Sequence, residues 1–298
     1  PRRGRQRPGA RRAAQEGRRA VRNDPPSTTV RAELPADPAD CPPLDPAFTA
    51  RLDAALAAAD LELSDAVRAG IEAHVRLLLA WTQAINLTAI RTPAGVALEH
   101  VADALAALPL LQRLGLREQP DVLDLGSGGG FPGLPLGLAL PAGRLVLLDS
   151  IGKKARFLRV AAAASSAAVT SAGGDPPVIS VIAERAEALA DAGRRSPELD
   201  LVTVRAVADL SSLAGLGLPL LREGGWLVAW KRDAGDGALA TEIGAASATL
   251  EALGGRLEEH AAVTVPGLED HRLMAIRKGP RPAPRQAPRQ GSRRQGGA

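Results

Sequence analysis

The stretch from Asp121 to Gly133, with the sequence DVLDLGSGGGFPG, decides the fold of this 298-residue chain. An apolar run at 122–125 ends in four glycines within five positions, and an apolar-periodic segment from Leu134 to Leu140 follows. This pattern predicts a buried strand, a tight turn and a helix with Pro132 in its first turn. Glycines adopt backbone angles that other residues avoid and let a ligand approach the main chain. Because the helix start also offers free N–H groups, the stretch predicts a loop that binds a nucleotide-like cofactor.

Two acidic residues bear on which cofactor this is. The spacing Gly128-x-Gly130-x-x-Gly133 matches the dinucleotide fingerprint, which is weak evidence by itself. Asp124 stands just before the first glycine, and a carboxylate there suits the positive charge of S-adenosylmethionine better than a pyrophosphate. Asp149 ends the next predicted strand, where its carboxylate can accept hydrogen bonds from both ribose hydroxyls of an adenosine cofactor. A plain strand–turn–helix crossover without a ligand is the remaining interpretation.

Strand and helix patterns alternate after the glycine loop. This order predicts an α/β fold with a doubly wound, mostly parallel seven-stranded sheet, preceded by a helical cap. The segment from Ser165 to Pro177 is predicted to be a flexible loop, and the last two strands an antiparallel hairpin. We expect strands at 122–125, 144–149, 178–183, 200–204, 226–230, 256–265 and 272–277. We expect helices at 48–59, 64–86, 96–114, 132–140, 152–164, 186–192, 208–221 and 238–253.

Charge is distributed very unevenly along the chain. Residues 1–22 carry a net charge of +8 and residues 279–298 carry +5, so a total of +4 leaves −9 on residues 23–278. Both ends are rich in Arg, Gln, Pro and Gly, which predicts disorder. They could hold RNA phosphates or be solvated extensions without a partner. The predicted organisation is a basic extension at 1–45, a helical cap at 46–116, an α/β domain at 117–278 and a basic tail at 279–298.

Composition argues against several other classes. The single cysteine, Cys41, excludes an internal disulfide, and four scattered histidines give no ligand spacing for a metal. No apolar run reaches the roughly 18 residues of a membrane span, and no signal-peptide core is visible. We therefore expect a soluble, cytoplasmic protein without a metal.

Several short motifs in residues 47–278 resemble one known family. The chain is similar to RsmG, also called GidB, the bacterial small-subunit ribosomal RNA methyltransferases. The similar motifs are Asn86–Arg91 (NLTAIR), His100–Asp103 (HVAD), the glycine loop through Gly133, Leu148–Leu158 (LDSIGKKARFL), Arg185-Ala186-Glu187, Val204-Arg205-Ala206, Val265–Leu268 (VPGL) and Arg272.

The resemblance implies a fold, an activity and a set of contacts. The fold would be that of a class I S-adenosylmethionine-dependent methyltransferase, with residues 117–278 as the methyltransferase domain. It implies methyl transfer from S-adenosylmethionine to N7 of the guanine at position 527, in the 530 loop of 16S rRNA. The partner would be 16S rRNA, within a small ribosomal subunit or its precursor, and the protein a monomer. The resemblance places cofactor contacts at Gly126, Phe131, Ala186, Glu187 and Arg205. The arguments above add Asp124, Gly128 and Asp149.

This chemistry requires no dedicated catalytic residue. Guanine N7 has an in-plane lone pair and no hydrogen, so we expect catalysis by in-line positioning of the reactants and by nearby carboxylates such as Asp124. Arg205 would pair with the methionine carboxylate, or would hold guanine O6.

Other features leave alternatives open. The basic run Lys153, Lys154, Arg156 and Arg159 either faces phosphates or is a solvated helix face. His100 and Asp103 can touch at i and i+3, at the RNA-facing edge or in a structural role. Two alternative functions also stay open: the chain could be a dinucleotide-dependent oxidoreductase, or a non-catalytic RNA-binding protein with a methyltransferase fold.

Overall fold

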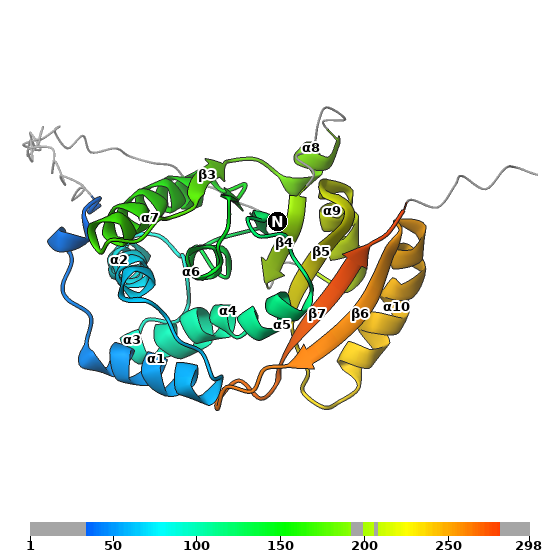
Figure 1. The fold of residues 1–298 in the computed structure, drawn as a ribbon, viewed down its shortest axis with the longest axis horizontal. Helices are drawn as coiled ribbons and strands as arrows, with labels where there is room; N and C mark the ends of the chain where they lie inside the picture. The colour runs from blue at the N-terminus through cyan, green and yellow to red at the C-terminus, as the bar shows by residue number, and fades with distance from the viewer. Residues whose placement is uncertain (1–33, 192–198, 206–207, 281–298) are drawn as a thin grey trace, which may run out of the picture. The chain divides into compact units, whose positions relative to one another are not determined.

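The computed structural model of the protein describes residues 34–191, 199–205 and 208–280, which form a seven-stranded sheet with helices on both faces (Figure 1). The strand order is β3-β2-β1-β4-β5-β7-β6, and only the pairings of β7 are antiparallel. The predicted fold class is confirmed. The strand order reverses between β1 and β4, and such a switch point is where open α/β sheets bind ligands. The strands are β1 Asp121–Leu125, β2 Arg144–Leu148, β3 Val178–Ile182, β4 Leu199–Arg205, β5 Leu221–Arg232, β6 Gly255–Ala262 and β7 His271–Lys278.

The helices cover the two faces of the sheet and bury two separate apolar clusters (Figure 1). Successive residues of a strand point to opposite faces, so Val122 packs toward α2, α6 and α7, and Leu123 packs toward α9 and α10. The helices are α1 Pro46–Ala58, α2 Asp65–Thr82, α3 Pro93–Val96, α4 Asp103–Leu105, α5 Leu108–Arg113, α6 Gly133–Ala139, α7 Gly152–Ser171, α8 Ala186–Asp191, α9 Leu210–Gly217 and α10 Ala238–Ala252, with short turns η1 Pro38–Asp40, η2 Ala97–Ala102 and η3 Leu218–Leu220.

The predicted cap precedes β1. Ser64 caps α2 by accepting a hydrogen bond from the N–H of Val67 at 3.3 Å, as its position before an apolar run predicts. The third predicted helix is interrupted: α3 passes into the π-helical turn η2, continues as α4 and breaks before α5. A π-helical turn frequently marks a functional segment, and His100 and Asp103 lie in it and directly after it.

Helix α7 contradicts the prediction of a loop from Ser165. The helix continues to Ser171 because this part of it packs closely on α2. A Cβ atom at Gly70 of α2 would lie 2.7 Å from Cγ2 of Val169 and 3.3 Å from the carbonyl oxygen of Ser165. Small residues here permit a close contact between two helices, so tertiary packing overrides a composition typical of loops.

The prediction that residues 1–45 form a disordered extension is also partly wrong. Cys41 is 5% exposed, its carbonyl oxygen accepts a hydrogen bond from Arg76 at 2.7 Å, and the indole of Trp81 donates to the carbonyl oxygen of Pro35 at 2.7 Å. Residues from Leu34 onward therefore belong to the folded part. The predictions for 1–33 and 281–298 lie outside the described residues. One cluster contains Phe48 of the cap and residues of the sheet, so a boundary at 116/117 stays a proposal.

The expectation that no run has the length and composition of a membrane span does not hold for residues 93–113. An 18-residue window of this helical run has a mean hydropathy of 1.4, but 61% of that window is buried inside the protein. A core helix of a soluble protein has the same features, so the run by itself is weak evidence for a membrane.

Candidate cofactor and substrate site

The glycine loop leaves β1 at the carboxyl edge of the sheet. Gly126, Gly128 and Gly130 have φ angles of 75°, 55° and 90°, the left-handed region that glycine adopts without strain. The N–H groups of Gly126 and Ser127 both donate to the carbonyl oxygen of Leu148 at 2.9 Å. The loop is therefore fixed to the end of β2.

His74 of α2 holds the same loop from the cap. Its Nε2 lies 2.7 Å from the carbonyl oxygen of Gly129, and because a carbonyl only accepts, Nε2 carries the proton. Burial lowers the pKa of His74 to about 4, so the ring is neutral. A Cβ atom at Gly130 would lie 2.8 Å from Nε2, so glycine is also required here for close approach. The sequence offers no motif for this histidine, only its place on a helix with an apolar face.

Asp149 joins two loops at the end of β2. One carboxylate oxygen accepts from the N–H of Gly128 at 3.0 Å and the other from the N–H of Ile151 at 2.8 Å. Each oxygen keeps a second acceptor position, which a ribose hydroxyl could use. That contact stays a prediction.

Asp124 lies beneath the loop and is completely buried. Its Oδ1 accepts from the hydroxyl of Thr203 at 2.9 Å, and its Oδ2 has no partner among the described residues. Burial raises the pKa of Asp124 to about 6, although interactions with Ser127, Thr203 and the N–H of Gly133 and the charge of Arg205 oppose this. A Cβ atom at Gly133 would lie 2.4 Å from Cβ of Asp124. The third glycine of the fingerprint thus makes room for Asp124 under the helix, and a contact between this carboxylate and a cofactor stays a prediction.

The ring of Phe131 is packed between the loop and the cap. It stacks on His100 with centroids 4.7 Å apart and contacts His74 with centroids 4.6 Å apart, and the guanidinium of Arg205 lies 5.7 Å from its centre. Only 5% of Phe131 is exposed, so its ring aligns the loop with the cap.

Arg205, at the end of β4, connects the sheet to the cap. Nη1 donates to Asp103 at 2.8 Å and to the carbonyl oxygen of Glu99 at 3.0 Å, and Nη2 lies 2.9 Å from Nδ1 of His100. Nδ1 of His100 also lies 3.1 Å from the carbonyl oxygen of Glu99, and its Nε2 lies 2.6 Å from the hydroxyl of Thr88. Burial and then Arg205 lower the pKa of His100 to about 4. The predicted partners, His100 and Asp103, therefore meet at Arg205.

Asp103 is the buried centre of this connection. Its Oδ1 lies 2.7 Å from Nδ1 of His271 on β7, and its carbonyl oxygen accepts from the indole of Trp230 on β5 at 3.0 Å. One cap residue is thereby linked to β4, β5 and β7. No pattern within the sequence predicts these pairings.

A pocket of about 340 Å³ lies beside Arg205, on the β4 and β5 side of the switch point. Nine residues line it: Ile90, Glu99, His100, Asp103, Arg205, Trp230, Lys231, Arg232 and His271. Its volume is at the lower end of the range for small-molecule sites. The pocket and the glycine loop therefore lie on the two sides of Arg205 and Phe131.

The remaining predicted residues lie at the start of α8, which follows β3. Ala186 is half-buried against the second apolar cluster and Glu187 is exposed. Within the described ranges, neither has a hydrogen bond to the glycine loop. Among all the residues that the structure describes, no group of three or more His, Cys, Asp or Glu side chains could hold a metal ion.

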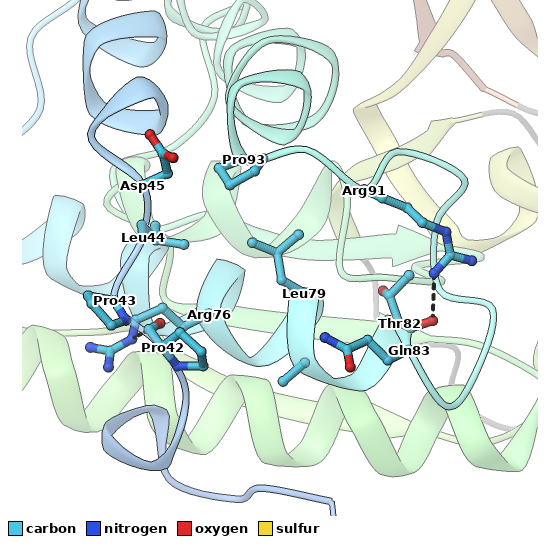
Figure 2. Close-up of a pocket in the computed structure, with 11 residues that line it drawn as sticks. Pro42, Pro43, Leu44, Asp45, Arg76, Leu79, Thr82, Gln83, Arg91 and Pro93 are labelled. Atoms are coloured by element: carbon cyan, nitrogen blue, oxygen red, sulfur yellow. Dashed lines mark hydrogen bonds between the residues drawn. The ribbon is translucent and has the colours of Figure 1, made fainter.

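The cap contains a separate pocket of about 420 Å³, shown in Figure 2. Prolines and Leu79 line it together with Arg76 and Arg91, and Arg91 donates to the carbonyl oxygen of Thr82 at 3.1 Å. None of the predicted site residues lines this pocket.

Comparison with solved structures gives low overall similarity. Fibrillarin from Aeropyrum pernix, in complex with natively bound S-adenosyl-L-methionine, aligns over 58% of this chain and 75% of that chain, with a TM-score of 0.43 and 15% identity. The family assignment therefore rests on sequence.

Sequence matches are much stronger. The ribosomal RNA small subunit methyltransferase G of Roseiflexus sp. (strain RS-1) is 37% identical over 202 residues, 67% of this chain and 79% of the relative. The protein of the same name from Anaeromyxobacter sp. (strain Fw109-5) is 38% identical over 204 residues, 68% of this chain and 87% of the relative. The family model GidB, rRNA small subunit methyltransferase G, matches residues 68–258, from the cap helix that carries His74 to the hairpin. The chain is thus a member of the rRNA small subunit methyltransferase G family.

Proposed function

We propose that this protein transfers a methyl group from S-adenosylmethionine to N7 of a guanine in the 530 loop of 16S rRNA. The observation that supports this most directly is the glycine loop, which lies inside the family match and is fixed between β1, β2 and the cap. Relatives that match over most of their length carry the name of a small-subunit rRNA methyltransferase.

The site residues suit this cofactor. Bound S-adenosylmethionine supplies an electrophilic methyl group on a sulfonium. The buried Asp124 carboxylate, with one oxygen unpartnered among the described residues, adds negative charge beneath the loop where a sulfonium would be favoured. Asp149 offers its free acceptor positions to a ribose, and Arg205 is at the mouth of the site, 16% exposed. We assign the remaining cofactor contacts to Gly126, Gly128, Phe131, Ala186 and Glu187.

With the cofactor bound, the site residues have to position the acceptor guanine and stabilise the positive charge that moves from the sulfonium to the base. Guanine N7 needs no base, so the chain supplies orientation, which can contribute several kcal/mol to the rate. We place the acceptor base in the pocket beside Arg205, because it lies across the switch point from the glycine loop. Family membership favours this reaction over a dinucleotide-dependent oxidoreductase. We further propose a monomer without a metal that acts in the cytoplasm on a small ribosomal subunit or its precursor.

The test uses the full chain, radiolabelled S-adenosylmethionine and small ribosomal subunits from a strain that lacks the modification. We expect one N7-methylguanine in the 530 loop by mass mapping, and calorimetric binding of S-adenosylmethionine but not of NAD. Asp149→Asn should weaken cofactor binding, whereas Asp175→Asn, an exposed carboxylate before β3, should not. An unmethylated subunit, or binding of NAD in preference, would overturn the proposal.

A further inference from the structure

The first two turns of α7 carry the basic residues Lys153, Lys154, Arg156 and Arg159, here called the α7 basic surface. Three are exposed and Lys154 is half-buried. Among the residues that the structure describes, none of the four has a carboxylate within ion-pair distance. Most of the other basic side chains do have one, at residues 68, 76, 113, 117, 144, 205, 222, 231, 232, 256 and 272.

This absence of partners is unusual for the composition of the chain. Residues 23–278 carry a net charge of −9, so carboxylates are plentiful. Within the described part of the chain, the one aromatic contact of the α7 basic surface is the guanidinium of Arg156 over the ring of Trp81, at 5.7 Å. That contact fixes one side chain of the surface and leaves its charge uncompensated.

The position of these charges on the helix makes them costly in the free protein. A helix N-terminus carries partial positive charge and favours anions, and a cation placed there is unfavourable. The first turn of α7 contains no acidic residue. The acid just before it, Asp149, is bound by the N–H groups of Gly128 and Ile151. An external anion would therefore relieve a repulsion that the fold leaves in place.

The surface adjoins the cofactor site. Helix α7 begins directly after the Asp149 turn, at the carboxyl edge of β2, and Ile151 in that turn is 43% exposed. Lys153, Arg156 and Arg159 are spaced i, i+3 and i+6, so they form one stripe about 9 Å long. A strand whose base occupied the pocket beside Arg205 would carry phosphates close to this edge of the sheet.

We propose that the α7 basic surface binds backbone phosphates of the rRNA strand that flanks the target base. This inference rests on the proposed function and adds where the RNA docks. The folded part of the protein is acidic and would repel RNA elsewhere, so phosphate contacts must be local. The surface positions the substrate and takes no part in binding the cofactor.

The experiment compares the double variant Lys153→Gln/Arg159→Gln with the wild-type full chain. For unmodified 16S rRNA, we expect weaker binding and a slope of log K against log salt that is smaller by about 1.4, since each single-strand phosphate contact contributes about 0.7. Between about 50 and 200 mM salt, the wild-type affinity should then fall about sevenfold more than that of the variant. S-adenosylmethionine affinity should not change, and the melting temperature should stay the same or rise.

Arg68→Gln/Arg256→Gln is the matched control, because it removes the same charge from exposed ion pairs on other elements. Equal salt slopes for the two double variants would overturn the inference. A loss of S-adenosylmethionine affinity in the α7 variant would also overturn it, because the charges would then serve the cofactor. If wild-type protein fails to methylate, the proposed function fails, whatever the salt slopes show.

Discussion

At the scale of single residues, the glycine loop contains glycines with different roles. Gly126 and Gly130 are required by their left-handed backbone, whereas Gly133 is required because the Asp124 side chain occupies the space beside it. Asp124 in turn is buried with one oxygen unpartnered among the described residues, next to the proposed site of a cationic cofactor. Packing, backbone conformation and charge are therefore set within a few adjacent positions.

The role of Gly133 can be tested by adding one methyl group. Gly133→Ala would place Cβ 2.4 Å from Cβ of Asp124, and we expect a loss of about 1–3 kcal/mol in the free energy of unfolding. Gly152→Ala, at the start of α7, meets no atom within 4 Å and should be neutral or slightly stabilising. Urea denaturation measures both, and equal stabilities for the two variants would contradict this account.

Asp124 should make the fold more stable in mild acid. Its pKa is about 6 in the folded state against 3.8 when unperturbed, so the folded state takes up a proton first and gains stability as pH falls through 6. Relative to Asp124→Asn, the wild type should gain about 1 kcal/mol between about pH 7.5 and pH 5. Parallel stability curves for the two proteins would show that this carboxyl is not perturbed.

His74 should act in the opposite direction. Its pKa is about 4 in the folded state against 6.5 when unperturbed, so its contribution is complete above 6.5 and is lost as pH falls toward 4. His74→Gln keeps a donor for the carbonyl oxygen of Gly129 and removes the titration. Between about pH 7.5 and pH 5, the wild type should lose about 2 kcal/mol relative to this variant in chemical denaturation. A loss of the same size in both would assign the acid sensitivity to other groups.

At the scale of elements, a buried ion pair joins β4 to the cap. Arg205 and Asp103 are separated by 102 residues in sequence, and their side chains are 16% and 1% exposed. Removing one partner leaves the other buried without its counter-charge, which typically costs about 3–5 kcal/mol.

A double-mutant cycle tests this connection. We expect Arg205→Gln and Asp103→Asn each to lower the free energy of unfolding by several kcal/mol, and the double variant to lose at least about 1 kcal/mol less than their sum. The exposed pair Arg113–Glu259, at 2.6 Å, is the control and should give a coupling energy below about 1 kcal/mol. Additive effects at Arg205 and Asp103 would mean that the pair does not hold the cap.

At the scale of the whole molecule, the folded part begins before the predicted cap. Pro35 accepts a hydrogen bond from Trp81, and Cys41 is in the same apolar cluster as Phe48 and Trp81. The strongly basic residues 1–22 precede this segment. The folded part therefore already includes residues 34–45, so a boundary at residue 45 comes too late in the chain.

Two deletions distinguish these boundaries. Removing residues 1–33 should leave the melting temperature and S-adenosylmethionine affinity unchanged and, at most, weaken RNA binding at low salt. Removing residues 1–45 should lower the melting temperature, because it uncovers Trp81 and leaves Arg76 without the carbonyl oxygen of Cys41. Equal melting temperatures for the two truncated proteins would show that residues 34–45 do not contribute to stability.

Much of the fold and part of the site could be predicted from local sequence. The alternation of apolar runs predicted all seven strands, and Ser64 predicted the start of α2. The predicted loop from Ser165 was wrong as far as Ser171, because the side chain of Val169 and the backbone of Ser165 pack against Gly70, a residue of another helix. His74 was missed for the same reason, since its hydrogen bond to the glycine loop spans 55 positions.

The sequence by itself determined the strand–turn–helix unit at Asp121–Gly133, the mostly parallel sheet and the family of the chain. These depend on periodicity and on glycines whose backbone angles are local requirements. The tertiary structure alone decided that Asp124 lies beneath Gly133, that Arg205 pairs with Asp103, and that the first turn of α7 has no carboxylate beside its basic side chains within the described part of the chain. Those outcomes depend on which distant residues become neighbours in the fold, and a linear pattern does not contain that information.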